Sequence, residues 1–299
     1  MGMKFHNSMP IDRRVLLTML AGSLIAPLSG TEVIGQAIGA TGPAPFSSSR
    51  LRITRRGTLG PAGRDIILIP GLASGPSIWN GLVGQLSGHR LHLVHIAGFA
   101  GLDAGANATG PMLSPLTAEL ARYISSQPMR QPTLIGHSMG GTLAMMLALR
   151  HSRAVNRIMV VDMLPEGAAM LGGTAQGVGY LASQLNGYFT GTKAGRQIFA
   201  RMLMQTPGGR DSDPRVIAQA LTELAEVDLT SRLGNIACPL EVVYALPAER
   251  DVAADQNRRY RQAYAKAPRT RLVGIGPGGH MLMLDQPEKF ATTVRKFLK

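Results

Sequence analysis

Residues 133–149 read TLIGHSMGGTLAMMLAL, a short apolar run, a serine between glycines, and then a segment of helix-forming residues. The run has the length of a buried strand, and the Ala, Leu and Met residues after the glycines favour a helix. Ser138 is therefore expected at a sharp turn between a strand and a helix. Gly136 and Gly140 suit such a turn, because larger side chains would collide with the closely packed backbone. The turn would expose the Ser138 hydroxyl, which predicts a nucleophile.

A five-residue match is weak by itself in a chain with 36 glycines, so the surroundings of the serine carry the interpretation. A second glycine-rich turn, Gly278-Gly279-His280, lies far downstream, just past another apolar run. A serine hydroxyl needs an adjacent base to become a good nucleophile. His280 is the histidine best placed to be that base.

These landmarks, in this order, resemble the α/β-hydrolase fold superfamily, and within it the serine esterase and lipase branch. LIPG at residues 68–71 lies near the front, the Ser138 turn in the middle and His280 near the end, and the likeness extends over residues 50–299. The resemblance implies hydrolysis of a small-molecule carboxylic ester through an acyl-enzyme on Ser138. His280 would act as the general base, and no cofactor is implied.

The rest of the chain alternates short apolar runs with segments of helical period, which is typical of βαβ units. The runs lack a period of two, so we expect a mostly parallel sheet covered by helices on both faces, in an α/β-hydrolase fold. One catalytic domain is expected over residues 51–299. Within it, residues 163–238 are too long for a simple connection and predict an inserted helical cap. The expected strands are residues 66–69, 91–96, 133–136, 158–161, 240–245 and 272–275.

The first residues differ in composition from the rest of the chain. Arg13 and Arg14 precede an apolar stretch, residues 15–28, which is shorter than the ~20 residues needed to span a bilayer. Small residues follow, so residues 1–37 predict an export signal, joined by a linker over residues 38–50. The paired arginines resemble a twin-arginine signal, which implies an exported, periplasmic or secreted protein. An uncleaved membrane anchor and a cytoplasmic protein are the alternatives.

Charge, cysteine and histidine content narrow the classes of partner. The net charge is +13, but no nucleic-acid motif accompanies the basic residues, so we expect a solvated basic face and no nucleic-acid partner. Membrane contact is expected only through the export signal.

Cys238 is the only cysteine of the sequence, which excludes an internal disulfide. His92 and His95, three residues apart on one strand, point to opposite faces, so no metal site is expected.

The acid that would orient His280 departs from the family pattern. Relatives commonly carry Gly-x-x-Asp after the strand represented here by residues 240–244, but this chain reads Ala-Leu-Pro-Ala from residue 245. Asp162, directly after the run at 158–161, occupies an alternative acid position that some branches of the family use. Asp251 and Glu249 are also candidates, because geometry rather than sequence order defines a triad.

The resemblance also implies an oxyanion hole built from two backbone N–H groups. One belongs to the residue after the nucleophile, Met139. Pro70-Gly71-Leu72 resembles the family's His-Gly-x turn, with proline in place of histidine. The resemblance implies that Leu72 supplies the second N–H group, and Ala73 is the alternative.

Other functions fit the same residues. Hydrolysis of a carbon–carbon bond and perhydrolysis use the same serine and histidine. A non-catalytic binding protein that keeps the fold gains support from the missing Gly-x-x-Asp turn. Dehalogenases and epoxide hydrolases of this fold use a carboxylate nucleophile, which Ser138 does not replace.

Overall fold

The computed structural model describes residues 46–129, 131–172 and 208–299. The predicted export signal and residues 38–45 of the predicted linker lie outside these residues, and both assignments stay predictions. In the part of the chain that is described, no helix is both long and apolar enough to cross a membrane.

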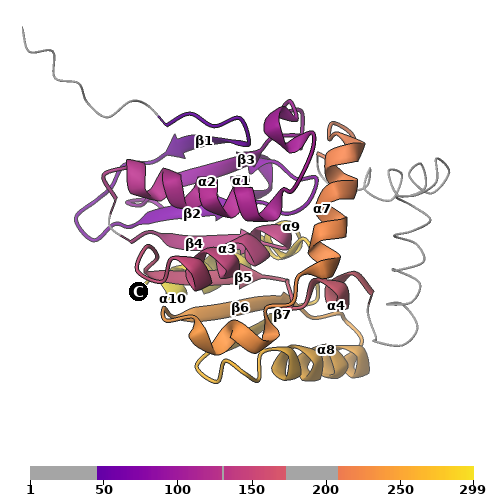
Figure 1. The fold of residues 1–299 in the computed structure, drawn as a ribbon. Coiled ribbons are helices and arrows are strands. Elements are labelled where there is room, and N and C mark those ends of the chain that lie inside the picture. The colour runs from indigo at the N-terminus through magenta and orange to yellow at the C-terminus, as the bar shows by residue number, and fades with distance from the viewer. Residues whose placement is uncertain (1–45, 130, 173–207) are drawn as a thin grey trace, which may run out of the picture. The chain divides into compact units, whose positions relative to one another are not determined.

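A seven-stranded sheet forms the centre of the fold, in the order β1-β3-β2-β4-β5-β6-β7 (Figure 1). β1 pairs antiparallel with β3, and the other neighbours are parallel. The α/β class and the mostly parallel sheet predicted from the sequence are confirmed. The strands are β1 (Leu51–Arg56), β2 (Asp65–Ile69), β3 (Arg90–Ile96), β4 (Thr133–His137), β5 (Arg157–Val161), β6 (Leu240–Ala245) and β7 (Arg271–Ile275).

Helices cover both faces of the sheet, as expected for strands that are apolar on both sides. One buried cluster joins the sheet to α2 (Leu113–Ser126), α3 (Met139–Arg150) and α8 (Arg250–Ala263). The other joins the opposite face to α1 (Asn80–Val83) and α10 (Pro287–Leu298), where Trp79 stacks on Phe290 at 6.3 Å between ring centroids. The shorter elements are η1 (Pro76–Trp79), η2 (Gly105–Asn107) and α9 (Leu282–Asp285).

The sequence analysis placed the start of the domain at Leu51 but did not predict a strand there. β1 carries buried Leu51 and half-buried Ile53, which pack against the core, and exposed arginines at positions 52, 55 and 56. β1 lies at one end of the strand order and pairs with β3 alone, so among the described residues one of its edges is open. An edge strand with a solvated face lacks the continuous apolar run that marks the inner strands.

Only the two ends of the predicted cap, residues 163–238, lie in the described part of the chain. They contain α4 (Gly167–Gly172), α7 (Pro214–Glu226) and η3 (Thr230–Asn235). The Asp213 carboxylate accepts the N–H of Arg215 and caps α7, which begins with Pro214, as helix starts commonly do. The Glu223 carboxylate of α7 accepts the N–H groups of Met112 and Leu113 at 2.7 and 2.8 Å, so α7 is tied to the start of α2. Residues 173–207 lie outside the described part of the chain.

Candidate active site

Ser138 lies between β4 and α3 in a backbone conformation that non-glycine residues rarely adopt, with φ 51° and ψ −122°. Its neighbours explain how the turn is reached. A Cβ atom on Gly136 would lie 2.1 Å from the carbonyl oxygen of Gly140, and a Cβ atom on Gly140 would lie 2.3 Å from the carbonyl oxygen of Ile69. Only glycine fits at both positions. The predicted strand, turn and helix around Ser138 are thus present, and its side chain is partly exposed.

The turn after β2 approaches the nucleophile turn closely. A Cβ atom on Gly71 would lie 3.0 Å from the Cβ atom of Ser138, so Gly71 brings its own backbone against the serine. Leu72 follows directly, and Ala73 has a positive φ of 52°. Met139 is the first residue of α3, and the first N–H groups of a helix have no partner within it. The two backbone segments predicted to form the oxyanion hole therefore lie beside Ser138.

His280 is paired with Asp162. The Nδ1–H of His280 donates to Oδ2 of Asp162 at 2.7 Å, although the two residues are 118 positions apart. Asp162 lies directly after β5 with φ 47° and is buried, whereas the His280 side chain is 43% exposed. A half-exposed imidazole held by a buried carboxylate can exchange protons at its free Nε2 atom.

Burial raises the pKa of Asp162, but donors around the carboxylate outweigh that effect and leave the pKa below its ordinary value. Besides His280, the donors are the backbone N–H of Ala245 at 2.9 Å and the hydroxyl of Tyr260 at 3.0 Å, both to Oδ1. The carboxylate is therefore ionised at neutral pH and accepts three hydrogen bonds.

The two rival acids lie elsewhere on the fold. Glu249 precedes α8 and Asp251 lies in its first turn, and both are exposed. Neither makes a hydrogen bond to His280 among the described residues, whereas Asp162 does. The contact geometry therefore favours Asp162.

His137, the last residue of β4, links the turn that carries Ser138 to the loop that carries His280. The imidazole of His137 is buried, donates from Nε2 to the carbonyl oxygen of His280 at 2.9 Å, and lies 4.6 Å from the His280 ring, centroid to centroid. Within the described residues the Ser138 hydroxyl makes no hydrogen bond to His280. Such bonds are often long in unliganded enzymes and shorten when substrate binds.

His137 is a residue whose part in the site the sequence did not reveal. Burial, and then the neighbouring His280, lower its pKa to about 3, so its imidazole is neutral over the physiological range. Its Nδ1 atom has no hydrogen-bond partner among the described residues. The only sequence signal was its place inside the serine turn, where packing close to the nucleophile is inevitable.

The loop that carries His280 is fastened from the following helices. Asp285 accepts the N–H of Gly279 at 2.8 Å, Gln286 donates to the carbonyl of Pro277 at 2.5 Å, and Lys289 donates to the carbonyl of Gly276 at 2.6 Å. These contacts limit the loop's freedom to move away from Asp162.

Two of the histidines around β3 make hydrogen bonds to other groups of the protein. His92 is buried, donates from Nε2 to Asp65 at 2.8 Å and accepts at Nδ1 from the Tyr123 hydroxyl at 2.6 Å. His95 contacts the carbonyl of Phe99 instead, at 2.8 Å. No group of three possible metal ligands occurs among the residues that the structure describes.

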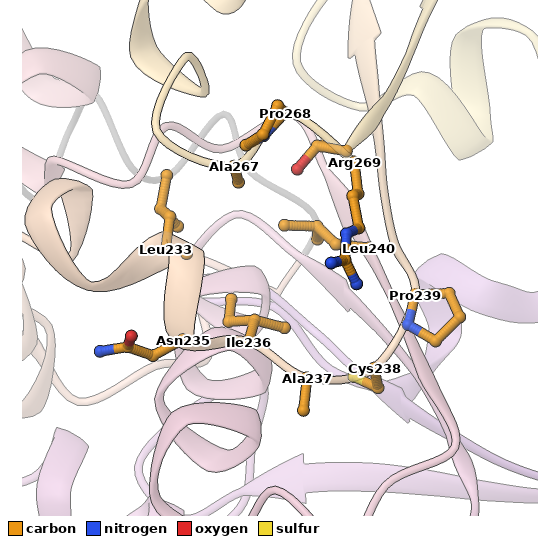
Figure 2. A pocket seen from close by; sticks show the side chains of 12 residues that line it. Leu233, Asn235, Ile236, Ala237, Cys238, Pro239, Leu240, Ala267, Pro268 and Arg269 are labelled. Atoms are coloured by element: carbon orange, nitrogen blue, oxygen red, sulfur yellow. The ribbon is translucent and has the colours of Figure 1, made fainter.

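A hollow of about 570 Å³ lies at the amino ends of β6 and β7, and Figure 2 shows the residues that line it. It is lined by residues just before β6 and β7, including Cys238 and Arg269, whereas Ser138 and Asp162 follow the carboxyl ends of their strands. Burial raises the pKa of the Cys238 thiol, so the thiolate is disfavoured at neutral pH. This hollow is therefore separate from the serine and histidine.

Comparison with known proteins agrees with this geometry. The sequence profile described as "Alpha/beta hydrolase family" matches residues 66–293. The pimeloyl-(acyl-carrier protein) methyl ester esterase of Vibrio cholerae is 27% identical over 261 residues, which span 79% of this chain and 94% of that protein.

Solved structures give the same picture of the fold. The esterase EaEST from Exiguobacterium antarcticum has a TM-score of 0.62 at 19% identity, over 83% of this chain and 95% of that one. The enol-lactonase from Burkholderia xenovorans LB400 has a TM-score of 0.60 at 18% identity, over 83% and 96%. At such identities the likeness shows the fold alone.

Proposed function

Because this chain belongs to the alpha/beta hydrolase family, we propose that it hydrolyses carboxylic esters through an acyl-enzyme on Ser138. The observation that carries the proposal is the 2.7 Å hydrogen bond between His280 and Asp162, at the edge of the sheet where Ser138 sits on its strained turn. Acyl transfer needs a nucleophile, a base near it and an acid that orients the base. A serine on a strained turn and a histidine hydrogen-bonded to a carboxylate, at the same edge of the sheet, fit these three roles.

In the proposed mechanism, Nε2 of His280 takes the proton from the Ser138 hydroxyl as its oxygen attacks the ester carbonyl. The tetrahedral oxyanion accepts hydrogen bonds from the N–H groups of Leu72 and Met139. His280 then gives its proton to the departing alcohol. Water, deprotonated by His280, attacks the acyl-enzyme, and His280 returns that proton to the Ser138 oxygen as the acid is released. Asp162 stays ionised throughout and stabilises the imidazolium that forms twice per cycle.

The choice of ester over other acyl bonds is supported by the name of the Vibrio cholerae relative, which refers to a methyl ester. The contact between Asp162 and His280 also weakens the case for a non-catalytic binding protein, which rested on the missing Gly-x-x-Asp turn.

The proposal is tested by hydrolysis of p-nitrophenyl esters from acetate to palmitate, and of methyl esters followed by methanol release. The full chain is assayed beside Ser138→Ala and the control Ser125→Ala, whose exposed hydroxyl donates to the carbonyl of Arg122 in its own helix. We expect Ser138→Ala to lose at least ~10⁴-fold in kcat. Ser125→Ala should keep the activity of the parent.

A fluorophosphonate provides the independent readout. Mass spectrometry should find the adduct on the peptide that contains Ser138, and Ser138→Ala should remain unmodified. If no ester is cleaved and Ser138 stays unlabelled, the hydrolase mechanism is refuted and a binding role replaces it. If Ser138 is labelled but only carbon–carbon bonds are cleaved or peracids are formed, the nucleophile stands and the ester specificity is wrong.

A further inference from the structure

We propose that Tyr260 is a positioning residue, whose hydroxyl holds the Asp162 carboxylate in the orientation that His280 requires. The proposal rests on the proposed function, since it assigns a role within the same site. Tyr260 comes from α8, 98 residues away from Asp162, and its hydroxyl donates to Oδ1 at 3.0 Å.

The position of Asp162 creates the need for such a donor. Asp162 follows β5, so its carboxylate must reach sideways over the end of β6 to meet a histidine on the loop after β7. Its backbone N–H donates to the carbonyl of Val243 at 2.7 Å, and its Oδ1 accepts the N–H of Ala245 at 2.9 Å. These two contacts tie it to β6 from the backbone. Tyr260 supplies the remaining contact, from the side of α8.

The ring of Tyr260 is held firmly enough to act as a fixed donor. Its exposed fraction is 0%, and it lies between two other tyrosine rings. It stacks on Tyr244 at 4.1 Å between centroids with 12° between planes, and it is nearly parallel to Tyr264 at 6.5 Å. Tyr244 is fixed in turn by its hydroxyl, which donates to Asn257 at 2.6 Å. Little conformational freedom is then lost when the hydroxyl engages the carboxylate.

The protonation state of Tyr260 suits this role. Burial, and then the charge of Asp162, raise the pKa of Tyr260 well above its ordinary value, so the hydroxyl keeps its proton at every pH at which the enzyme would work. It therefore always donates. The same hydrogen bond contributes to keeping Asp162 ionised.

The neighbouring tyrosine provides a matched control. Tyr264 is buried and shares the stack, but its hydroxyl donates to the backbone carbonyl of Met163 at 2.8 Å and does not contact the carboxylate. Tyr260→Phe and Tyr264→Phe each remove one buried hydroxyl and keep the ring. The difference between them isolates the contact with Asp162.

For Tyr260→Phe we expect kcat on a p-nitrophenyl ester to fall about 10-fold, the scale of one hydrogen bond to a charged group, with KM unchanged. The acid limb of the kcat/KM profile should move to lower pH, because a carboxylate that is no longer held towards His280 stabilises the imidazolium less. Tyr264→Phe should keep the parent's kcat and pH profile, and circular dichroism checks that both variants are folded. Equal kinetics in the two variants would overturn the proposal.

A second readout does not depend on turnover. The Nδ1 proton of His280, hydrogen-bonded to Asp162, should give a far-downfield proton NMR signal that is absent from His280→Gln. The signal should shift in Tyr260→Phe and stay in place in Tyr264→Phe. If the parent cleaves no ester but the signal shifts only in Tyr260→Phe, the proposed function fails while the positioning of Asp162 by Tyr260 holds. An unshifted signal refutes the positioning role whatever the activity.

Discussion

In the proposed mechanism, Asp162 takes the place of the aspartate that is missing after β6. The turn after β6 lacks an aspartate, yet the N–H of Ala245 in that strand still donates to a carboxylate, which now comes from the neighbouring β5. We expect Asp162→Asn to lower kcat about 10³- to 10⁴-fold. The amide no longer stabilises the imidazolium of His280, and it does not fix the tautomer of the neutral imidazole. Asp251→Asn, on the exposed first turn of α8, should leave kcat unchanged. Steady-state kinetics with one ester decides between them, and the reverse pattern would move the acid to Asp251.

His137 makes stability depend on pH. Its pKa is lowered to about 3 by burial, below the ~6.5 of an exposed histidine, so the unfolded chain binds a proton that the folded chain does not. This contribution is fully present above pH 6.5 and is lost as the pH falls towards 3, by up to ~1.4 kcal/mol per pH unit. His137→Gln keeps a donor for the His280 carbonyl but does not titrate. Urea unfolding from pH 7 to 4 should show a shallower loss of stability for His137→Gln than for the exposed control His151→Gln; equal slopes would contradict this account.

Single residues could be predicted from the sequence where a local pattern marks them. Contacts between residues that are distant in the sequence could not. Glycines on either side of Ser138 and before His280 mark turns, so both residues could be singled out without a structure. Nothing in the sequence ranked Asp162 firmly above Asp251, because the choice depends on which carboxylate β6 and α8 can hold. Tyr260 and His137 act through contacts across 98 and 143 positions, for which a single sequence carries no signal.

Among the elements, β2, β3 and α2 are locked together at the end of the sheet remote from Ser138. Asp65, which begins β2, pairs with Arg90 at 2.5 and 3.0 Å and with His92 at 2.8 Å, and His92 meets Tyr123 of α2. Burial works against ionisation of Asp65, but these donors leave its pKa below the ordinary value. Asp65→Asn should reduce the free energy of unfolding by about 2–4 kcal/mol, because it leaves buried donors without their carboxylate.

Equilibrium urea unfolding measures that loss, and Asp251→Asn serves as the exposed control. The kcat of folded Asp65→Asn should equal that of the parent, since the network lies at the amino ends of the strands. A stability change below about 0.5 kcal/mol, the usual range for surface substitutions, would show that the network adds nothing.

Elements with a strong apolar signature were predicted well. The six expected strands correspond to β2 through β7, and all of them except β7 are largely buried. β1 was missed because arginines interrupt its apolar residues, as an edge strand permits. The cap was inferred from the length of chain between β5 and β6 and from its helical period, and the helix expected at residues 214–226 is present as α7.

Over the whole molecule, the parallel strand direction decides where chemistry can occur. Ser138, Asp162 and His280 come from three separate regions of the sequence, yet all follow the carboxyl ends of parallel strands and meet at one edge. The order of these landmarks along the chain therefore predicts that they share this edge of the sheet. The net charge of +13 is a separate property of the surface and has no part in that prediction.

The edge strand β1 also bears on solubility. A strand paired on one side offers its free N–H and C=O groups to any other strand, including the same strand of a second molecule. Two β1 strands that met edge to edge would bring Arg52, Arg55 and Arg56 of both copies together, and like charges would oppose the pairing. We expect the triple replacement of these arginines by threonine to raise light scattering on concentration while the parent stays clear. These three side chains, on the strand at the β1 end of the sheet, would then set how concentrated the protein can become before it self-associates.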